Sequence, residues 1–318
     1  MSPLPLPSFA PATRHPSQPV RHRIGVDGGG THTRLRLCDA RGRVLGEGQA
    51  GPSALGQGIE QAWGAVAQAL QAAALQAGVA RPEWRDCALG LGLSGANNPG
   101  LVAAFLQADP GCAQLALEGD AVTGVLGAHA GAPGALLIAG TGSIALALQA
   151  DGQRVQVGGW GWLNGDEGSG AWLGKAALRH AMRALDGRDA TGPLARTLFQ
   201  HIGRRAEDLL AWQAQAAQGR FASLAPLVFE HASADFKAQQ LLAAAVQQLE
   251  DMVAAVDPGR SLPLCLSGSV AKRLAPQFSA ALRARCVPPQ GDAMEGALRL
   301  LAAPEQDPTR IADGQAHA

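Results

Sequence analysis

The chain has 318 residues, a formal net charge of zero and 47% hydrophobic residues. This length predicts two domains, and the neutral charge gives no electrostatic basis for a nucleic-acid partner. Five scattered cysteines without Cys-x-x-Cys spacing argue against a disulfide framework and a zinc site.

The chain begins with a proline-rich segment, residues 1–22, that has no continuous apolar core. It is predicted to be a disordered tail rather than a signal peptide. The uncharged run 130–150 contains Pro133 and a polar centre, so it is not expected to span a membrane. We therefore expect a cytoplasmic protein with no membrane partner and with reduced thiols.

The first glycine-rich turn follows a predicted strand at 24–27 and precedes strands at 33–39 and 44–48. Its residues are Asp27, Gly28, Gly29, Gly30 and Thr31. Backbone amides in such a turn can cradle phosphate, and Asp27 could hold a hydrated divalent cation. The alternative is an ordinary hairpin with a capping aspartate.

Two further polar positions follow buried strands in the first half. After a helix at 57–76, the strand at 87–93 ends at Ser94. A helix at 99–107 and a strand at 114–117 then lead to Asp120, which precedes a helix at 121–130. Ligand-facing acids of α/β folds occupy the carboxyl ends of strands, but aspartate also caps helices, so both roles are open for Asp120.

A second glycine-threonine turn lies between predicted strands at 134–139 and 144–149. It consists of Gly140, Thr141, Gly142 and Ser143. The letters GTGSIA fit a loose dinucleotide fingerprint, but that fingerprint requires a helix next, and here an Asp-Gly hairpin leads to a strand at 154–157. The turn instead offers amides and hydroxyls to a phosphate, and the order of elements repeats that of the first half.

Residues 158–170 read GGWGWLNGDEGSG, with six glycines among thirteen residues. Trp160 offers an aromatic face and Asp166 a hydrogen-bond acceptor, which together suit a small polyhydroxylated molecule. The alternative is a glycine-rich surface loop. Lys175, in a segment that fails the P-loop spacing, is predicted to be solvated.

The remaining chain is predicted to be mainly helical. Helices at 170–185, 193–202, 206–215 and 234–256 form an insertion, and a strand follows at 262–266. Gly268 and Ser269 then either contact a nucleotide or simply begin a helix at 271–283. A closing helix is predicted at 291–301.

These motifs together resemble the BadF/BadG/BcrA/BcrD ATPase family, and within it the N-acetylglucosamine and glucosamine kinases of the actin-like ATPase superfamily. The matching segments are VDGGGTHTR, LGLSG, GDA, IAGTGS, GGWGWLNGDEGSGAWLG and LSGSVA, in family order from Arg23 to Ala302. At Ala54 many relatives have Asn, and at Gly119 some do.

The resemblance implies an α/β fold of two ribonuclease-H-like domains around a central cleft, with a helical insertion in the second at about 170–257. The expected boundaries are 23–119 and 120–290, with 291–303 as a closing helix that returns to the N-terminal domain. We also expect a homodimer.

The resemblance also implies site roles. ATP and Mg²⁺ are the expected cofactors, with Asp27 holding the metal through water. ATP contacts are expected from Gly28 to Thr31, from Gly140 to Ser143, and from Gly268 and Ser269. Asp120 matches the catalytic base, and the sugar-side positions match Ser94, Trp160 and Asp166.

The expected reaction is phosphorylation of an amino sugar at its 6-hydroxyl, for which positioning and charge stabilisation dominate. N-acetylglucosamine is favoured over glucosamine because the segment at 52–55 is small, apolar and uncharged. Two alternatives are a dehydratase-activating ATPase and a non-catalytic sugar sensor on the same fold. The isolated cysteines argue against the first, and the complete transfer apparatus argues against the second.

Overall fold

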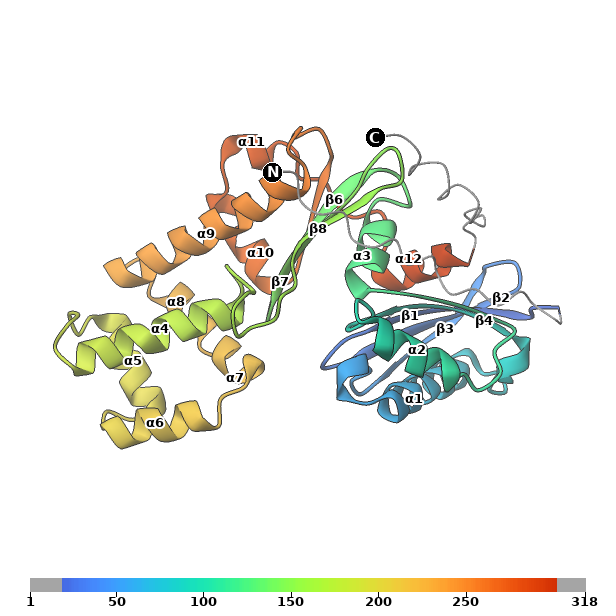
Figure 1. The fold of residues 1–318 in the computed structure, drawn as a ribbon, viewed down its shortest axis with the longest axis horizontal. Coiled ribbons are helices and arrows are strands. Elements are labelled where there is room, and N and C mark those ends of the chain that lie inside the picture. Colours follow the sequence, from blue (N-terminus) through green and yellow to red (C-terminus); the bar gives the residue numbers. More distant parts are fainter. Residues whose placement is uncertain (1–18, 302–318) are drawn as a thin grey trace, which may run out of the picture. The chain divides into compact units, whose positions relative to one another are not determined.

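The computed structural model describes residues 19–301, so residues 1–18 of the predicted tail lie outside the described part (Figure 1). Residue His22 already begins the first strand, one residue before the predicted start of order. Contacts divide the described chain into a first unit, 19–131 with 290–301, and a second unit, 132–289.

The first unit contains one mixed sheet with strand order β3-β2-β1-β4-β5. Strands β1, β4 and β5 are parallel, whereas β2 and β3 run antiparallel to their neighbours. Its elements are β1 (His22–Gly28), β2 (Thr33–Asp39), β3 (Val44–Ala50), α1 (Ile59–Ala77), β4 (Cys87–Leu93), α2 (Pro99–Gln107), β5 (Gln114–Glu118), α3 (Asp120–Ala128) and α12 (Ala293–Leu300), with 3₁₀ turns at Leu55–Gln57 and Trp84–Asp86.

Strand β4 lies inside this sheet, between β1 and β5. All seven of its residues are buried, as expected for a strand with parallel neighbours on both sides and helices on both faces. Helix α12 packs on β1 and β4 so closely that a Cβ on Gly90 would lie 1.9 Å from the carbonyl oxygen of Ala297. Helix α12 therefore completes the core that the first 131 residues begin.

The predicted domain boundary at Asp120 needs correction. The structure places α3 in the first unit and the division between Gly131 and Ala132. Small residues explain this, because a Cβ on Gly127 of α3 would lie 1.8 Å from the carbonyl oxygen of Asp292, just before α12. The two helices therefore pack directly against each other.

The second unit contains a sheet of order β8-β7-β6-β9, which repeats the third-second-first-fourth order of the first unit. Its strands are β6 (Gly134–Ala139), β7 (Ser143–Leu148), β8 (Arg154–Gly158) and β9 (Leu264–Ser267). Its helices are α4 (Gly170–Leu185), α5 (Pro193–Ile202), α6 (Ala206–Ala214), α7 (Gln218–Ala222), α8 (Ala225–Glu230), α9 (Phe236–Val256), α10 (Ser269–Leu274) and α11 (Ala280–Arg283), with a 3₁₀ turn at Ala275–Gln277.

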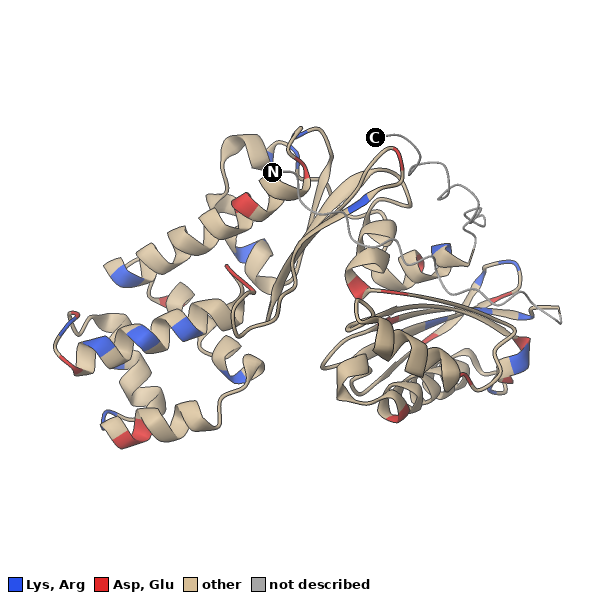
Figure 2. Ribbon diagram, viewed as in Figure 1, with Lys and Arg blue, Asp and Glu red and all other residues tan. Residues whose placement is uncertain are grey.

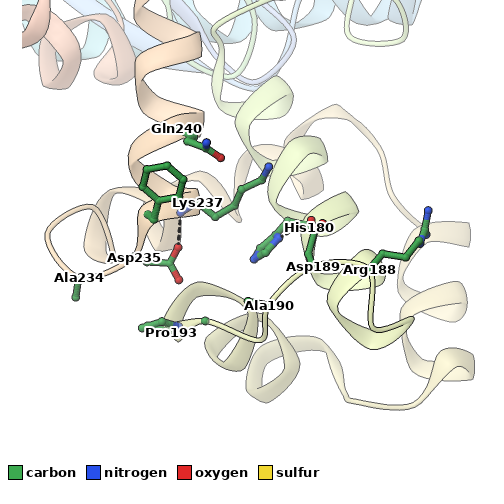
Figure 3. Close-up of a pocket in the computed structure, with 11 residues that line it drawn as sticks. His180, Arg188, Asp189, Ala190, Pro193, Ala234, Asp235, Lys237 and Gln240 are labelled. Atoms are coloured by element: carbon green, nitrogen blue, oxygen red, sulfur yellow. Dashed lines mark hydrogen bonds and ion pairs between the residues drawn. The ribbon is translucent and has the colours of Figure 1, made fainter.

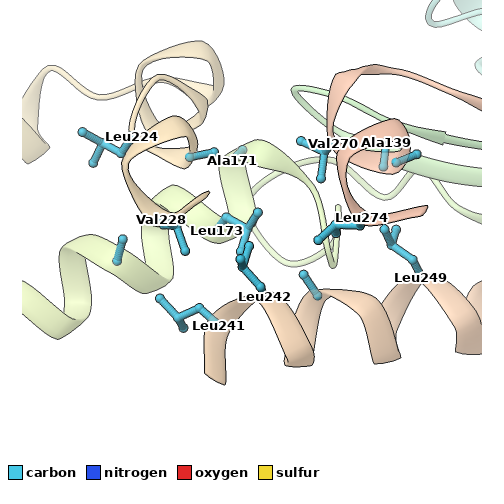
Figure 4. Close-up of a cluster of buried hydrophobic side chains, with 14 of the residues drawn as sticks. Ala139, Ala171, Leu173, Leu224, Val228, Leu241, Leu242, Leu249, Val270 and Leu274 are labelled. Carbon is cyan, nitrogen blue, oxygen red and sulfur yellow. The ribbon is translucent and has the colours of Figure 1, made fainter. Parts of the chain in front are cut away.

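Each unit has its own buried hydrophobic cluster. In the second unit, Leu173 of α4 and Leu242 of α9 belong to one cluster with Leu274 of α10 (Figure 4). Charged residues lie mainly on the helices and loops, with a series of basic residues along α4 (Figure 2). Among residues 19–301, no helix combines the length and hydropathy needed to cross a bilayer.

Two predictions for the second unit were wrong in detail. The short helices α7 and α8 were not predicted, since each spans too few residues to show a helical period. The helix expected at 271–283 begins earlier, at Ser269, and is split into α10 and α11. Pro276 lies at the break, where its ring and missing N–H disfavour continuation of the helix.

Candidate active site

Three parallel strands of the first unit end side by side at the predicted polar residues. The registers pair Asp27 of β1 with Gly92 of β4, and Gly92 with Glu118 of β5. Just beyond, the amide of Ser94 donates to the carbonyl of Gly28 at 2.9 Å. The fold therefore gathers these predicted site positions at one edge of the sheet, where α/β proteins bind ligands.

The carboxylate of Asp27 is held by Arg34 of β2. Arg34 lies opposite Asp27 in the antiparallel register, and its Nε donates to Oδ2 at 3.1 Å. The guanidinium NH2 group donates to the same oxygen. Arg34 was not predicted as a site residue, although a tight turn between two strands pairs residues 27 and 34. This pair fixes the orientation of the acid beside the glycine turn.

The first glycine turn is open on one side. A Cβ on Gly28 would lie 2.1 Å from Oγ of Ser53, so packing alone requires glycine there. Gly29 has no atom within 4 Å of such a Cβ, and Gly30 has only the side chain of Gln57 at 3.5 Å. Neither residue has a positive φ. A ligand can therefore approach the chain closely at these two positions, where the packing of the unit does not itself require glycine. The amide of Gly29 already donates to the carbonyl of His32 at 3.0 Å.

Asp120 is the first residue of α3, and the N-cap is Gly119. Its Oδ1 accepts a hydrogen bond from the amide of Ala121 at 2.9 Å. Burial raises the pKa of Asp120 to about 6, and the negative charge of Asp27 adds to this rise. Of the two roles that the sequence left open, the N-cap is thus excluded. A carboxyl group that exchanges a proton near neutral pH has the property required of a general base.

The segment at 53–56 connects the glycine turn to Ser94. The amides of Ser53 and Ala54 both donate to the carbonyl of Gly29, and the amide of Leu55 donates to the carbonyl of Ser94. Ser53 and Leu55 are buried, so only the neighbouring positions face outward in this segment. Ala54 therefore lies between the proposed phosphate turn and the proposed sugar position.

The second glycine turn joins β6 to β7 and is tied to the start of α4. The amides of Gly170 and Ala171 donate to the carbonyls of Gly140 at 2.7 Å and Thr141 at 3.1 Å. Thr141 is exposed, so its hydroxyl is available to a ligand. The turn is thus held by the loop that the sequence singled out, residues 158–170.

Ser143 does not have the position predicted for a phosphate ligand. It is buried as the first residue of β7, and its Oγ donates to the carbonyl of Glu167 at 2.7 Å. Alternation along the strand directs this side chain inward, whereas Thr141 remains in the turn. Ser143 therefore supports the loop.

Asp166, which was predicted to be a sugar-side residue, is buried in the loop. It is only 4% exposed and adopts a left-handed backbone with φ of 55°. Its Oδ1 accepts from the amide of Ser143 at 3.3 Å, and its Oδ2 accepts from Nε2 of Gln218 at 2.7 Å. Burial raises its pKa. A Cβ on Gly142 would lie 2.8 Å from Oδ2, so the acid lies directly against the second glycine turn.

Gln218 is a second residue that sequence reasoning missed. It lies in α7, a helix too short for its periodicity to be recognised, and no motif marks it. Its contact with Asp166 connects the helical part of this unit to the glycine turn.

The two tryptophans of the loop have different environments. Trp160 is 84% exposed, which leaves its ring available to a ligand. Trp162 is partly buried, with its ring 5.7 Å from that of Phe221. Lys175, predicted to be solvated, instead donates to the carbonyls of Trp162 and Leu163, each at 2.9 Å. Lys175 therefore ties the part of the loop that follows Trp160 to α4.

Gly268 lies beside the second glycine turn. The register pairs Ser267 of β9 with Ile138 of β6, and a Cβ on Gly268 would lie 2.3 Å from the carbonyl oxygen of Ala139. Its φ of 84° also favours glycine. Ser269 is exposed at the start of α10.

Comparison with known proteins decides the family. The model of the BadF/BadG/BcrA/BcrD ATPase family matches residues 24–298. The chain belongs to this family. The resemblance inferred from the motifs is thereby confirmed.

Named relatives of the chain include sugar kinases. It is 32% identical to the glucosamine kinase GspK of Vibrio cholerae over 91% of this chain and 98% of that protein. It is 34% identical to the N-acetyl-D-glucosamine kinase of Dictyostelium discoideum over 44% of this chain and 47% of that protein. A solved structure of a proposed N-acetylglucosamine kinase from Chromobacterium violaceum matches with a TM-score of 0.85 and 44% identity, over 89% of this chain and 99% of that one.

The acidic side chains of the described residues suit a metal ion that is held mainly by water and by substrate phosphates. No group of three or more His, Cys, Asp or Glu side chains that could hold a metal occurs within residues 19–301. Mg²⁺ commonly keeps several waters and binds one or two carboxylates together with substrate phosphates. Asp27, next to the open main chain at Gly29, fits that arrangement.

Proposed function

We propose that the protein is an ATP-dependent kinase that phosphorylates the 6-hydroxyl of an amino sugar, N-acetylglucosamine or glucosamine. The observation that carries this proposal is Asp120, whose pKa is raised to about 6 beside Asp27 at the carboxyl end of the sheet. The kinases named among the relatives support the substrate class.

The nucleotide phosphates are assigned to the two glycine turns. The first turn contributes the main-chain amide of Gly30 and the exposed hydroxyl of Thr31, and Gly29, whose amide donates to the carbonyl of His32, leaves room for the phosphate. The second contributes the exposed Thr141, and Gly268 and Ser269 are assigned to the adenosine part. Ser143 and Asp166 are assigned to supporting the second turn, since their polar atoms already bond within the unit.

The sugar is assigned to Ser94, Asp120 and Trp160. Asp120 accepts the proton of the 6-hydroxyl while that oxygen forms a bond to the γ-phosphorus. The bond between this phosphorus and the β,γ-bridging oxygen breaks, and ADP leaves with the bond's electron pair. Positioning supplies much of the rate because the protein holds both reactants in line.

Mg²⁺, when bound with the nucleotide, would neutralise negative charge on the β- and γ-phosphates. Asp27 is assigned to hold it through water, and Arg34 keeps the Asp27 carboxylate in place.

Between the two sugars, we favour N-acetylglucosamine. Of the segment at 52–55, Ser53 and Leu55 are buried, which leaves Pro52 and Ala54 as an uncharged surface near Ser94. An acetamido methyl group tolerates such a surface, whereas a desolvated ammonium without a carboxylate partner is heavily penalised. The relative from V. cholerae, matched over 98% of its length, is named for glucosamine. The two sugars must therefore be compared directly as substrates.

The other two hypotheses fit the site less well. A dehydratase activator would need cysteine thiolates to bind an iron–sulfur cluster. Burial raises the pKa of Cys87 to about 12 and also raises the pKa of Cys112, so these thiols stay protonated. A sensor without catalysis would have no use for a base such as Asp120.

The decisive experiment is an ADP-release assay with purified protein, ATP and Mg²⁺, with each sugar in turn and with both in competition. We expect ADP release only with sugar present, and a higher kcat/KM for N-acetylglucosamine. Sugar-independent hydrolysis would contradict the kinase assignment, and a clear preference for glucosamine would contradict the assignment of Pro52 and Ala54.

A further inference from the structure

Helix α3, whose first residue is Asp120, lies directly on strand β4 at Gly92. A Cβ on Gly92 would lie 1.9 Å from Oγ1 and 2.8 Å from Cβ of Thr123. Rotation of the Thr123 side chain could not relieve the second contact, because Cβ is fixed to the helix backbone. Gly92 does not have a positive φ. Close approach of the helix, rather than backbone conformation, therefore requires glycine here.

Helix α12 contacts Thr123 at a second point. A Cβ on Gly296 of α12 would lie 1.8 Å from the carbonyl oxygen of Thr123 and 2.6 Å from the amide nitrogen of Gly127. Gly296 also lacks a positive φ. The side chain of Thr123 thus lies against β4, and its carbonyl lies against α12. We refer to Gly92, Thr123 and Gly296 as the Thr123 clamp.

Thr123 is tied to the first turn of α3. It is fully buried, with 0% of its surface exposed, and its Oγ1 donates to the carbonyl of Asp120 at 3.0 Å. Its amide donates to the carbonyl of Gly119 at 3.2 Å, and the amide of Val122 donates to the same carbonyl at 3.0 Å. A change in the position of Thr123 therefore moves Asp120 with it.

The hydrogen bond of the Asp120 carboxyl group lies within the turn itself. Oδ1 accepts from the amide of Ala121, the next residue, so this bond moves with the turn. At Gly119, the residue before Asp120, a Cβ would have no atom within 4 Å. The Thr123 clamp, by contrast, connects the turn to β4 and to α12.

The clamp holds the turn next to the strand that carries Asp27, because Gly92 is paired with Asp27 in the parallel register. Such positions matter for an enzyme, since a shift of about 1 Å can cost about 100-fold in rate. We propose that Gly92 and Gly296 are positioning residues of the base: they hold Thr123 and thereby fix the first turn of α3. The inference rests on the proposed function, in which Asp120 is that base.

The test is a pair of glycine variants in the first unit, assayed with saturating ATP and with whichever of the two sugars the wild type prefers. The methyl group of Gly296→Ala must displace Thr123, so kcat should fall about tenfold to hundredfold. KM for ATP should stay within about a factor of two, because both glycine turns are left in place.

Gly46→Ala is the matched control. Its Cβ would lie 2.4 Å from the carbonyl oxygen of Ala73 in α1, so it crowds a helix of the same unit that does not carry the base. Both variants should unfold at lower urea than the wild type, because each forces a helix away from the sheet. Only Gly296→Ala should lose kcat, and equal kcat values in the two variants would overturn the proposal.

A second pair of variants keeps the test decisive if Gly296→Ala does not fold. Thr123→Val and Thr123→Ala both lose the hydroxyl group and its bond to Asp120, and they differ in the volume left against Gly92. Valine still fills the space between helix and strand, whereas alanine leaves a gap in which the turn can move. The value of kcat should therefore be about threefold to tenfold lower in Thr123→Ala than in Thr123→Val. Equal values would refute the positioning role.

Hydrogen exchange distinguishes failure of this inference from failure of the proposed function. The amides of Val122 and Thr123 close the first turn, so they should exchange about tenfold faster in Gly296→Ala than in Gly46→Ala, whatever the protein phosphorylates. If they do, but the wild type releases no ADP with either sugar, the proposed function is wrong and the fixing of the turn by α12 stands. If the wild type is an active kinase and the exchange rates are equal in the two variants, the clamp is wrong and the kinase assignment stands.

Discussion

The two glycine-threonine turns read almost alike in sequence but need their glycines for different reasons. In the first, Gly29 faces empty space, so its lack of a side chain leaves room that the unit itself does not fill. In the second, a Cβ on Gly142 would lie 2.8 Å from Asp166 and 2.9 Å from Gln218. The same motif can therefore mark a position that is open to a ligand in one place and a tightly packed position in another.

The turns also differ in what lies beside them. The first has Asp120 nearby, with its pKa raised to about 6, and the Asp27–Arg34 pair. The second is supported by a buried carboxylate and an amide from the helical region. We infer that the groups that carry out phosphoryl transfer lie around the first turn, and that the second turn mainly binds the nucleotide.

The largest expected effect comes from Asp120→Asn. The variant keeps the shape and can still accept the hydrogen bond from Ala121, but it cannot accept a proton. Turnover should fall on the order of 10²–10⁴-fold, with sugar binding retained. Steady-state kinetics and calorimetry test this, with Asp151→Asn in the exposed β7–β8 turn as control. Near-normal turnover would remove Asp120 from the chemistry.

The pH profile should show the same carboxyl group. As pH falls through about 6, Asp120 becomes protonated and kcat should decline about tenfold per pH unit below that value. The ionised form carries the burial penalty, so the contribution of this group to stability is present at low pH and lost as pH rises through about 6. Asp120→Asn should accordingly lose the acidic limb and unfold at higher urea near pH 8 than the wild type. An acidic limb of kcat that persists in the variant would point to another base.

Substituting valine for Gly142 and for Gly29 tests directly whether the two turns need their glycines for different reasons. Gly142→Val must displace Asp166 and Gln218 and should cost about 1–3 kcal/mol of stability, the usual range for overpacking, and weaken ATP binding. A Cβ on Gly29 would have no atom within 4 Å, so Gly29→Val should change stability by less than about 0.5 kcal/mol, while it also weakens ATP binding. Urea unfolding and ATP titration measure both. Equal stability losses would refute the distinction between the turns.

The smallest effect on activity is expected for Gln218→Ala. The change leaves Oδ2 of the buried Asp166 without its donor, at a cost of about 1–2 kcal/mol, and loosens the second turn. KM for ATP should rise severalfold while kcat changes little, because the base is elsewhere. Gln213→Ala on the exposed surface of α6 is the control. A loss confined to kcat would mean that Gln218 acts differently.

Much of this arrangement was predictable because it depends on local patterns. Strand β4 was recognised from its unbroken apolar run, and α1 from its helical spacing, which ends at the left-handed Gly78. The polar residues after strands were found because the ends of parallel strands meet at one edge. The turns were found because glycine and threonine cluster there.

What could not be predicted depends on contacts between distant residues. Whether Ser143 faces a ligand or the core depends on the register of β7, which the turn letters do not state. Asp166 lies inward because Gln218, which is far away in sequence, reaches it. The packing of α4 against α9 likewise brings together residues that are far apart in the sequence, such as His180 and Lys237, which line one cavity (Figure 3).

Helix α12 has a consequence for how the protein is made. The ribosome releases the chain from its first residue onward, so β1 and β4 emerge long before the helix that covers Gly25 and Gly90. The second unit is contiguous in sequence and can finish folding during translation, whereas the first must wait for residues 293–300. A premature stop codon just before α12 would therefore spare the later half of the molecule and damage the earlier one.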